Sequence, residues 1–254
     1  MIAINASVSN ILLVGLVGSV LIGCSGQNGS SGSAGPAGPT GPSGFQEIYQ
    51  NDVYPSSSYS NEFDAYVSGN VFLGAQGSSP YLELTTGNQQ AYYTRILVQF
   101  TNFNLPSNVN LLAAEVWMTL ETATNVSGSV TIGAHAFSSS VYPTCAWNGT
   151  AYWDGPKSGS SWSACDNDQD FQQDGYFIST PMSTTVISSS ANGTNNVYRF
   201  LLNVKTLQTQ FTQGIIQFVL RSEGEFSSDG NSSIGFYPNT DTAGKAPKLI
   251  LTYQ

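Results

Sequence analysis

The residues with the clearest chemical potential are aromatic rings gathered in one stretch of the chain. This stretch contains Tyr142, Trp147, Tyr152, Trp153 and Trp162. Sugars present C–H faces that stack on aromatic rings, and a few polar groups beside the rings fix the sugar's orientation. We therefore predict a ligand-binding surface formed by Tyr142, Trp147, Trp153, Asp154 and Trp162. The alternative is that these rings fold inward and cap one end of the domain as core.

Carboxylates follow directly after the aromatic stretch. Asp166, Asp168 and Asp170 stand at alternate positions, the spacing with which oxygen ligands open a calcium-binding loop. The loop is not an EF-hand, because Gly does not follow Asp170 and Phe177 stands where that motif needs its bidentate Glu. The spacing predicts a calcium site of irregular geometry, and a solvated acidic loop is the alternative.

Residues suited to catalysis are few. The single histidine, His135, lies between two alanines without Ser-His-Asp or metal-ligand spacing, so we interpret it as a buried strand histidine with its partners satisfied. Four carboxylates, those of Asp64, Glu83, Glu115 and Glu121, are far apart in the sequence, which cannot show whether two of them pair as in a glycosidase. Without a positive motif, we predict that the protein is not an enzyme.

The charge balance bears on the partner. Seven Lys and Arg against sixteen Asp and Glu give a formal net charge of −9, and only 9% of the residues are charged. A nucleic-acid partner requires a basic patch, and the first basic residue is Arg95. We therefore expect no nucleic acid among the partners.

The N-terminal segment is typical of an export signal. Residues 11–22 are apolar and too short for a membrane-spanning helix of about 20 residues. They lead into Leu21-Ile22-Gly23-Cys24, which resembles a bacterial lipobox, although no Lys or Arg stands in the first ten residues. We predict that residues 1–23 are a lipoprotein signal peptide and that Cys24 carries lipid. An uncleaved apolar anchor is the alternative, and both place the remainder outside the cytoplasm.

The other two cysteines then form an even pair. Cys145 and Cys165 would be exported to an oxidising compartment, where a disulfide closing a loop of about 20 residues stabilises a fold by roughly 3 kcal/mol. We predict this disulfide, with two free buried thiols as the alternative.

A glycine repeat follows the lipobox. Glycine stands at every third position from Gly26 to Gly44, and Pro36, Pro39 and Pro42 follow three of these glycines. This pattern resembles a collagen-like repeat, in which only Gly fits the axis of the triple helix. We interpret residues 24–44 as an extended stalk. Six triplets are short for a triple helix, so a monomeric stalk and a trimer nucleated by the domains both remain open.

Residues 45–254 are predicted to form one all-β domain. Short alternating runs at 95–100, 115–120, 130–134, 216–220 and 249–253 indicate strands, and Asn, Gly, Ser and Pro clusters separate them. Residues 204–213 alone indicate a short helix. This pattern favours an antiparallel β-sandwich of jelly-roll type over an α/β fold.

Several motifs of this domain resemble one family in their order along the chain. They are Asp64-Ala65-Tyr66-Val67, the run 95–100 followed by Leu105-Pro106, Ala114-Glu115-Val116-Trp117, the strand and helix of 200–211, Ser222-Glu223 and the ending 247–253. Together they resemble the DNRLRE domains, jelly-roll modules of secreted and surface proteins that are related to carbohydrate-binding modules. The resemblance implies a jelly-roll fold and a binding function without catalysis.

These observations predict a lipid-anchored protein exposed at the cell surface or outside it. Its β-sandwich would serve adhesion or the binding of a polysaccharide or other surface glycan. The alternative is a structural subunit whose domains associate as homo-oligomers into an appendage or extracellular matrix.

Lipidation can be tested directly. Mass spectrometry of the native protein is expected to show a lipid-modified Cys24 at the N-terminus and no residues 1–23. Replacing Cys24 with Ser should release the protein from the membrane, because the lipid is then lost. Recovery of intact Met1, or unchanged membrane association of C24S, would contradict the lipobox interpretation.

Overall fold

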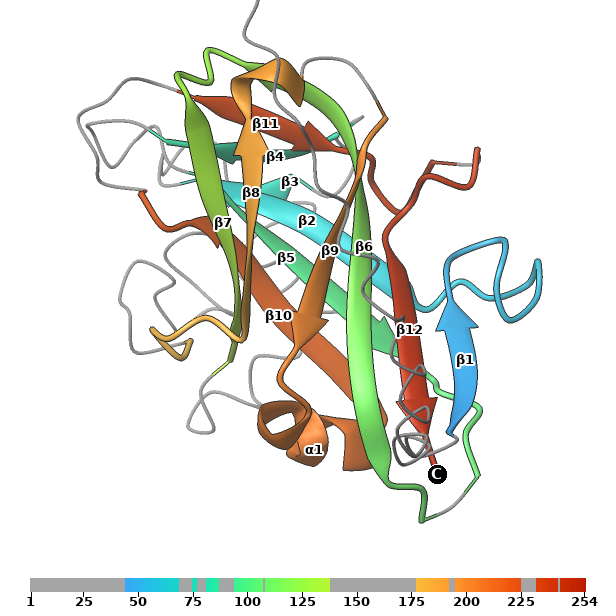
Figure 1. Cartoon of the computed structure of the whole chain (residues 1–254). Helices are drawn as coiled ribbons and strands as arrows, with labels where there is room; N and C mark the ends of the chain where they lie inside the picture. The colour runs from blue at the N-terminus through green and yellow to red at the C-terminus, as the bar shows by residue number, and fades with distance from the viewer. Residues whose placement is uncertain are drawn as a thin grey trace, which may run out of the picture. The chain divides into compact units, whose positions relative to one another are not determined.

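A computed structural model describes residues 44–68, 75–76, 81–86, 94–106, 108–137, 177–191, 195–224, 232–241 and 243–254. In these residues the chain forms two six-stranded antiparallel sheets and one short α-helix (Figure 1). No helix in this part of the chain is long and apolar enough to cross a membrane.

The first sheet is arranged around the fourteen-residue strand β6, Leu111–Thr124. Residues of β6 pair with β12 (Lys248–Tyr253), with β9 (Val197–Leu202) and with β11 (Ser233–Phe236). β1 (Phe45–Tyr49) extends the sheet beyond β12, and β4 (Leu82–Thr85) extends it beyond β11. The register aligns Trp117 with Lys248 on one side and with Arg199 on the other.

The second sheet has the order β3, β2, β5, β10, β7, β8. Its strands are Ala75–Gln76 (β3), Glu62–Ser68 (β2), Thr94–Thr101 (β5), Ile215–Ser222 (β10), Ser129–Ala136 (β7) and Ser183–Ser188 (β8). Every pairing is antiparallel. A 3₁₀ turn at Ser189–Ala191 follows β8.

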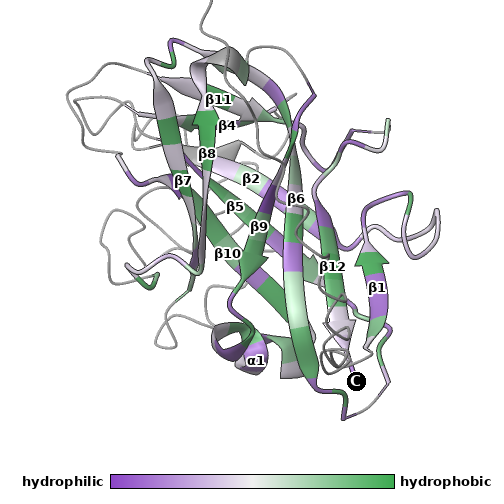
Figure 2. Cartoon of the chain, in the orientation of Figure 1, coloured by the Kyte–Doolittle hydropathy of each residue, from purple (hydrophilic) through white to green (hydrophobic). Residues whose placement is uncertain are grey.

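The two sheets share one apolar core. Along β6 buried and half-buried residues alternate, and the buried set includes Val116, Met118 and Leu120. These side chains belong to the same cluster as Val98 and Phe218 of the second sheet, and Figure 2 shows long hydrophobic stretches along β10 and β5. The predicted all-β sandwich with one short helix is confirmed, and each of the five predicted strands lies within an observed strand.

The second sheet departs from simple alternation, because both of its faces are covered. Thr94 to Phe100 are all buried, including polar residues such as Arg95 and Gln99 that point away from the shared core. Part of the cover is the ring of Phe177, which lies 4.8 Å from the guanidinium carbon of Arg95 and 5.0 Å from that of Arg221. A strand buried on both faces does not show which residues point toward the shared core.

The helix α1 comprises Val204–Thr212, so the predicted helix ends one residue early. Asn203 caps it by accepting a hydrogen bond from the main-chain N–H of Thr206 at 3.2 Å. On the buried side of the helix, the side-chain oxygen of Gln210 accepts a hydrogen bond from the main-chain N–H of Gln217 at 2.8 Å. The helix is thereby tied to the start of β10, and Gly214 (φ +75°) makes the turn that the tie requires.

Gly133 on β7 offers a test of the packing on the outer face of the second sheet. A Cβ added there would collide with the carboxylate of Glu223 and would lie 2.6 Å from Nε2 of His135. Gly133→Ala should therefore separate these two partners and lower the free energy of unfolding by roughly 1–3 kcal/mol, the scale for leaving a buried polar group unpaired. Urea unfolding measures the change. In a Glu223→Ala background the same substitution should cost less, and equal costs in both backgrounds would contradict this packing.

Candidate functional site

The residues predicted from sequence to act in lipidation, cross-linking and binding lie outside the described residues. They are Cys24, Cys145, Cys165, Tyr142, Trp147, Trp153, Asp154, Trp162, Asp166, Asp168 and Asp170. The described chain stops after Phe137 and resumes at Phe177, and these two residues form an isolated antiparallel bridge. Phe137 directly follows β7, so this bridge lies at the end of that strand.

The described residues contain a different constellation, on the outer face of the first sheet. Trp117 lies in the middle of β6, where the guanidinium carbon of Arg199 is 4.1 Å from its ring centre. From the other neighbouring strand, Nζ of Lys248 lies 5.6 Å from the same ring and 5.7 Å from the ring of Tyr54. The indole N–H of Trp117 donates to the carboxylate of Glu115 at 2.9 Å. Two cations are thus held against one aromatic ring, a contact that is stabilising even at exposed sites.

A second ring with a cation lies next to this row. Nζ of Lys245 is 4.4 Å from the ring centre of Tyr237 and donates to its hydroxyl oxygen at 3.2 Å. The side-chain oxygen of Asn195 accepts from Lys245 at 3.2 Å and from the Tyr237 hydroxyl at 3.0 Å. Tyr237 continues from β11 and its main-chain N–H donates to Thr119 of β6, which places this group two residues along β6 from Trp117.

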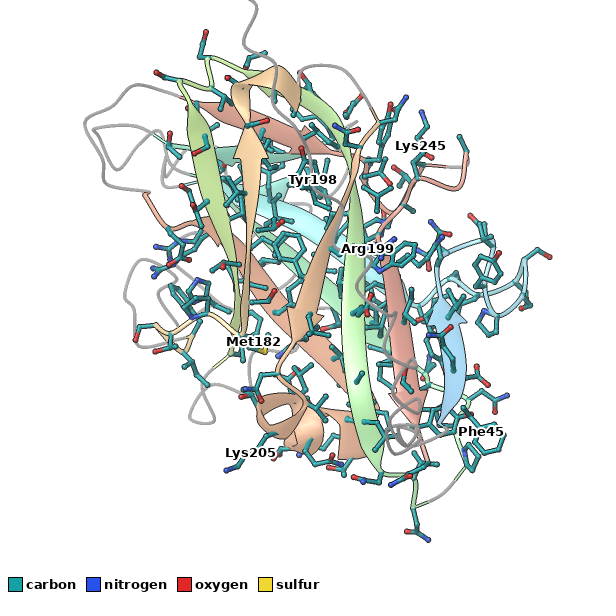
Figure 3. All side chains as sticks on the ribbon, viewed as in Figure 1. Phe45, Met182, Tyr198, Arg199, Lys205 and Lys245 are labelled. Carbon is teal, nitrogen blue, oxygen red and sulfur yellow. The ribbon has the colours of Figure 1, made fainter. Side chains whose placement is uncertain are left out.

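Several of the few basic residues of this acidic protein gather on this face, beside the carboxylates of Glu115 and Glu121. Three of the seven basic residues, Arg199, Lys245 and Lys248, lie on it. In Figure 3 Arg199 lies beside the middle part of β6 and Lys245 lies farther from α1, whereas Lys205 lies on α1 itself. We call Trp117, Arg199, Tyr237, Lys245 and Lys248 the cation–aromatic face. Its guanidinium and ammonium groups are held in position by contact with the rings of Trp117 and Tyr237.

A second constellation lies inside the sandwich, where β2 begins. Glu62 and Asp64 are both buried, with 0% and 1% of their surfaces exposed, and alternation along β2 puts them on one face. The carboxyl groups of Glu62 and Asp64 lie close enough to share a hydrogen bond. Asn239 donates its main-chain N–H to Asp64 Oδ2 at 2.6 Å and its Nδ2 to the carbonyl of Glu62 at 3.2 Å.

The burial of this pair changes its ionisation. Burial raises the pKa of Asp64 to about 7, although the hydrogen bond from Asn239 acts in the opposite direction. Burial and the neighbouring Asp64 carboxylate raise the pKa of Glu62 well above its ordinary value. Two carboxylates in contact cannot both ionise without a compensating positive charge, so near neutral pH the pair must hold either a proton or a cation.

His135 has the structural role expected from the sequence. It is fully buried on β7, and its Nδ1 lies 2.9 Å from the carbonyl oxygen of Ile178, while its Nε2 lies 2.7 Å from Glu223 Oε1. Both ring nitrogens are therefore engaged: Nδ1 contacts the segment that follows Phe177, and Nε2 contacts the residue that follows β10. Arg221, 3.2 Å from Nε2, completes this contact.

Of the carboxylates considered for a glycosidase pair, Glu115 and Glu121 are too far apart to form one. Glu115 and Glu121 lie on one face of β6, but six residues of extended chain place them on the order of 20 Å apart, beyond the roughly 5–9.5 Å of such pairs. Glu83 accepts a hydrogen bond from the Ser233 hydroxyl at 2.9 Å, and Asp64 is in the core. Within the described residues, no three or more His, Cys, Asp or Glu side chains form a metal-binding group.

A cavity of about 350 Å³ opens between α1 and the segment after β5. Phe103 and Phe211 line it with their rings stacked 6.2 Å apart, beside Leu105, Pro106 and Val109. Asn108 and Thr212 are the polar side chains among its described lining residues, and neither is an acid or base near neutral pH.

Both constellations were missed as sites by sequence reasoning, although each leaves a signal. Trp117 stands on the face of β6 opposite the apolar set, a position that a core residue would not take. Glu62 and Asp64 alternate with Phe63 and Ala65, and this pattern predicts that the two acids face solvent. Both acids are instead buried. No family model matches the chain, and a search of curated proteins gives no match.

The raised pKa values predict how stability depends on pH. Between about pH 4, the ordinary range of an Asp, and about 7, the folded pKa of Asp64, the folded state binds more protons than the unfolded state. The contribution of the pair to the free energy of unfolding therefore falls as the pH rises through this window. Urea unfolding in calcium-free buffer should show a shallower fall for Asp64→Asn, which keeps an acceptor for Asn239. Glu83→Gln is the control, and an identical pH profile for wild type and D64N would contradict the assignment.

Proposed function

We propose that this chain is a non-catalytic surface protein, exported and lipid-anchored through Cys24, whose β-sandwich of jelly-roll type binds polysaccharide. The two sheets around one core and the resemblance to DNRLRE modules support the fold part of the proposal. The observation that carries the binding part is the cation–aromatic face, in which Lys248, Trp117 and Arg199 stand in one cross-strand row.

The chemistry of this face favours an acidic polymer. Arg199 and Lys248, from the two strands beside β6, both lie against the ring of Trp117. This ring therefore acts chiefly to hold the two cations in place. Guanidinium and ammonium groups donate charge-assisted hydrogen bonds to carboxylate or sulfate groups. A row of such donors across a β-sheet suits an extended chain of uronic acid or sulfated sugar units.

The predicted loop is a second surface for the same function. Trp147, Trp153 and Trp162 would supply stacking faces for neutral sugar rings, whereas the cation–aromatic face would supply charge. The two surfaces therefore predict different ligands, and the comparison of acidic with neutral polysaccharides separates them.

The alternative function, assembly into an appendage or matrix, is supported by a different observation, the exposed edge strand β9. In the described part of the chain β9 pairs with β6 alone, and its Val197 and Leu201 are 49% and 60% exposed. An edge strand with exposed apolar side chains is a site for pairing with another chain. Concentration-dependent assembly without binding to any polysaccharide would favour this function.

Binding through the cation–aromatic face makes a definite prediction. Arg199→Ala or Lys248→Ala should each weaken binding to a polyuronate by about ten-fold or more, the scale of one charge-assisted hydrogen bond. Isothermal titration with a polyuronate and with a neutral glucan measures this. The matched control is Lys205→Ala, because Lys205 is exposed on α1 at the opposite end of the domain.

Three results distinguish the surfaces. Loss of polyuronate binding in R199A and K248A with none in K205A supports the cation–aromatic face. Loss in Trp153→Ala alone, with neutral glucan as the better ligand, places recognition in the loop. No binding of either polymer by folded wild-type protein rejects the proposed function.

A further inference from the structure

The buried carboxyl pair on β2 has more unpartnered oxygen atoms than a hydrogen-bonded core can hold. Both carboxylate oxygens of Glu62 and Oδ1 of Asp64 are buried without a hydrogen-bond partner. Oδ1 of Asn239 is also buried without one, and this residue comes from a different segment, after β11. Buried oxygens are nearly always paired, so four on three residues that contact one another indicate a missing partner.

A shared proton would satisfy only part of this set. One proton between Glu62 and Asp64 would supply a single hydrogen bond and engage one oxygen of each residue. The second carboxylate oxygen of Glu62 and the amide oxygen of Asn239 would stay unpaired, because both are acceptors. The other polar neighbour, Asn51, is already engaged, since it accepts from the main-chain N–H of Glu62 at 3.0 Å and donates to its carbonyl at 2.8 Å.

Positive side chains are not positioned to neutralise the pair. Asn51 and Asn239 are neutral, and the nearby Tyr59 donates its hydroxyl to the carbonyl of Thr101 at 3.1 Å. None of the ion pairs described for this part of the chain includes Glu62 or Asp64. Within the described residues, no basic side chain is paired with these two carboxylates, so the compensating charge that they require is left open for a bound cation.

We propose that Glu62, Asp64 and Asn239 bind one calcium ion between the two sheets. Calcium takes six to eight oxygen ligands from carboxylates, amide oxygens, main-chain carbonyls and water, and it tolerates irregular geometry. Glu62, Asp64 and Asn239 offer four unpartnered oxygens, and main-chain oxygens or water would complete the set. The site differs from the one predicted at Asp166, Asp168 and Asp170.

The position of this site gives the ion a structural effect. Glu62 and Asp64 belong to β2 of the second sheet, while Asn239 follows β11 and Asn51 follows β1 of the first sheet. An ion held by both sides would join the sheets at this edge. Binding to the folded state alone raises the unfolding temperature as the ligand concentration rises.

The experiment uses calcium chloride added to chelator-treated, dialysed full-length protein. We expect a saturable rise in unfolding temperature and one equivalent of bound calcium by isothermal titration. Glu62→Gln and Asp64→Asn should lose this equivalent, since each removes one negative charge from the site without changing side-chain volume. The matched control Glu83→Gln should retain it, because Glu83 binds the Ser233 hydroxyl.

The loop prediction is tested in the same series. If Asp166, Asp168 and Asp170 are replaced together by Asn and the equivalent is kept, the ion lies at the β2 pair. If this triple variant loses the equivalent while E62Q and D64N keep it, the proposal is overturned. Absence of calcium binding by folded wild-type protein overturns it as well and leaves the pair sharing a proton.

A second measurement remains decisive if E62Q or D64N fails to fold. Calcium must displace any proton held by the pair, so wild-type protein at pH 6 should release protons when it binds the ion. Titrations in buffers of different ionisation enthalpy count these protons. An exposed loop of ordinary carboxylates, already ionised at this pH, would release none, and that result would overturn the proposal.

Discussion

The long strand β6 is the constraint on which the rest of the domain depends. Its fourteen residues give a backbone partner to β12, β9 and β11, so most of the first sheet is aligned to one strand. Because side chains alternate along it, the same residues that bury Val116 and Met118 in the core must present Glu115 and Trp117 outward. The register then fixes Lys248 and Arg199 on either side of Trp117. The packing of the core and the register of the strands therefore determine the positions of Trp117, Arg199 and Lys248 on the cation–aromatic face.

Scarcity of charge shapes both constellations. With 9% charged residues, the chain has few opportunities for salt bridges, and its basic side chains rest on rings such as Trp117 and Tyr237. Contact with the face of a ring does not itself use the hydrogen-bond donors of a guanidinium or ammonium group, whereas a salt bridge does; Lys245 nevertheless donates to Asn195 and to the Tyr237 hydroxyl. Inside the sandwich, no basic residue of the described segments pairs with Glu62 or Asp64, so these two acids in contact depend on a proton or on an ion.

The sequence predicts the fold well where one face of a strand decides its pattern. The runs at 115–120 and 249–253 lie within observed strands, and the helix at 204–212 is signalled by its polar and apolar spacing and by the cap at Asn203. The second sheet is harder to predict from the sequence, because both faces of β5 are buried and alternation no longer shows which side chains point toward the shared core. For this reason the sequence pattern places Glu62 and Asp64 on a solvent-exposed face, whereas both lie in the core. A short edge strand such as β8, with polar and exposed residues, gives too weak a pattern to be predicted.

The two constellations are joined by one segment of chain. Residues 237–246 run from β11 to β12, with Asn239 turned to the buried pair and Tyr237 and Lys245 turned to the outer face. Asp241 folds this segment by accepting main-chain hydrogen bonds from Ala243 and Lys245 at 2.9 and 3.1 Å. Any ion or proton that fixes Asn239 also restricts the turn that carries Lys245. The occupancy of the core site would therefore set how rigidly one end of the cation–aromatic face is presented, and rigid donors lose less conformational entropy when a ligand binds.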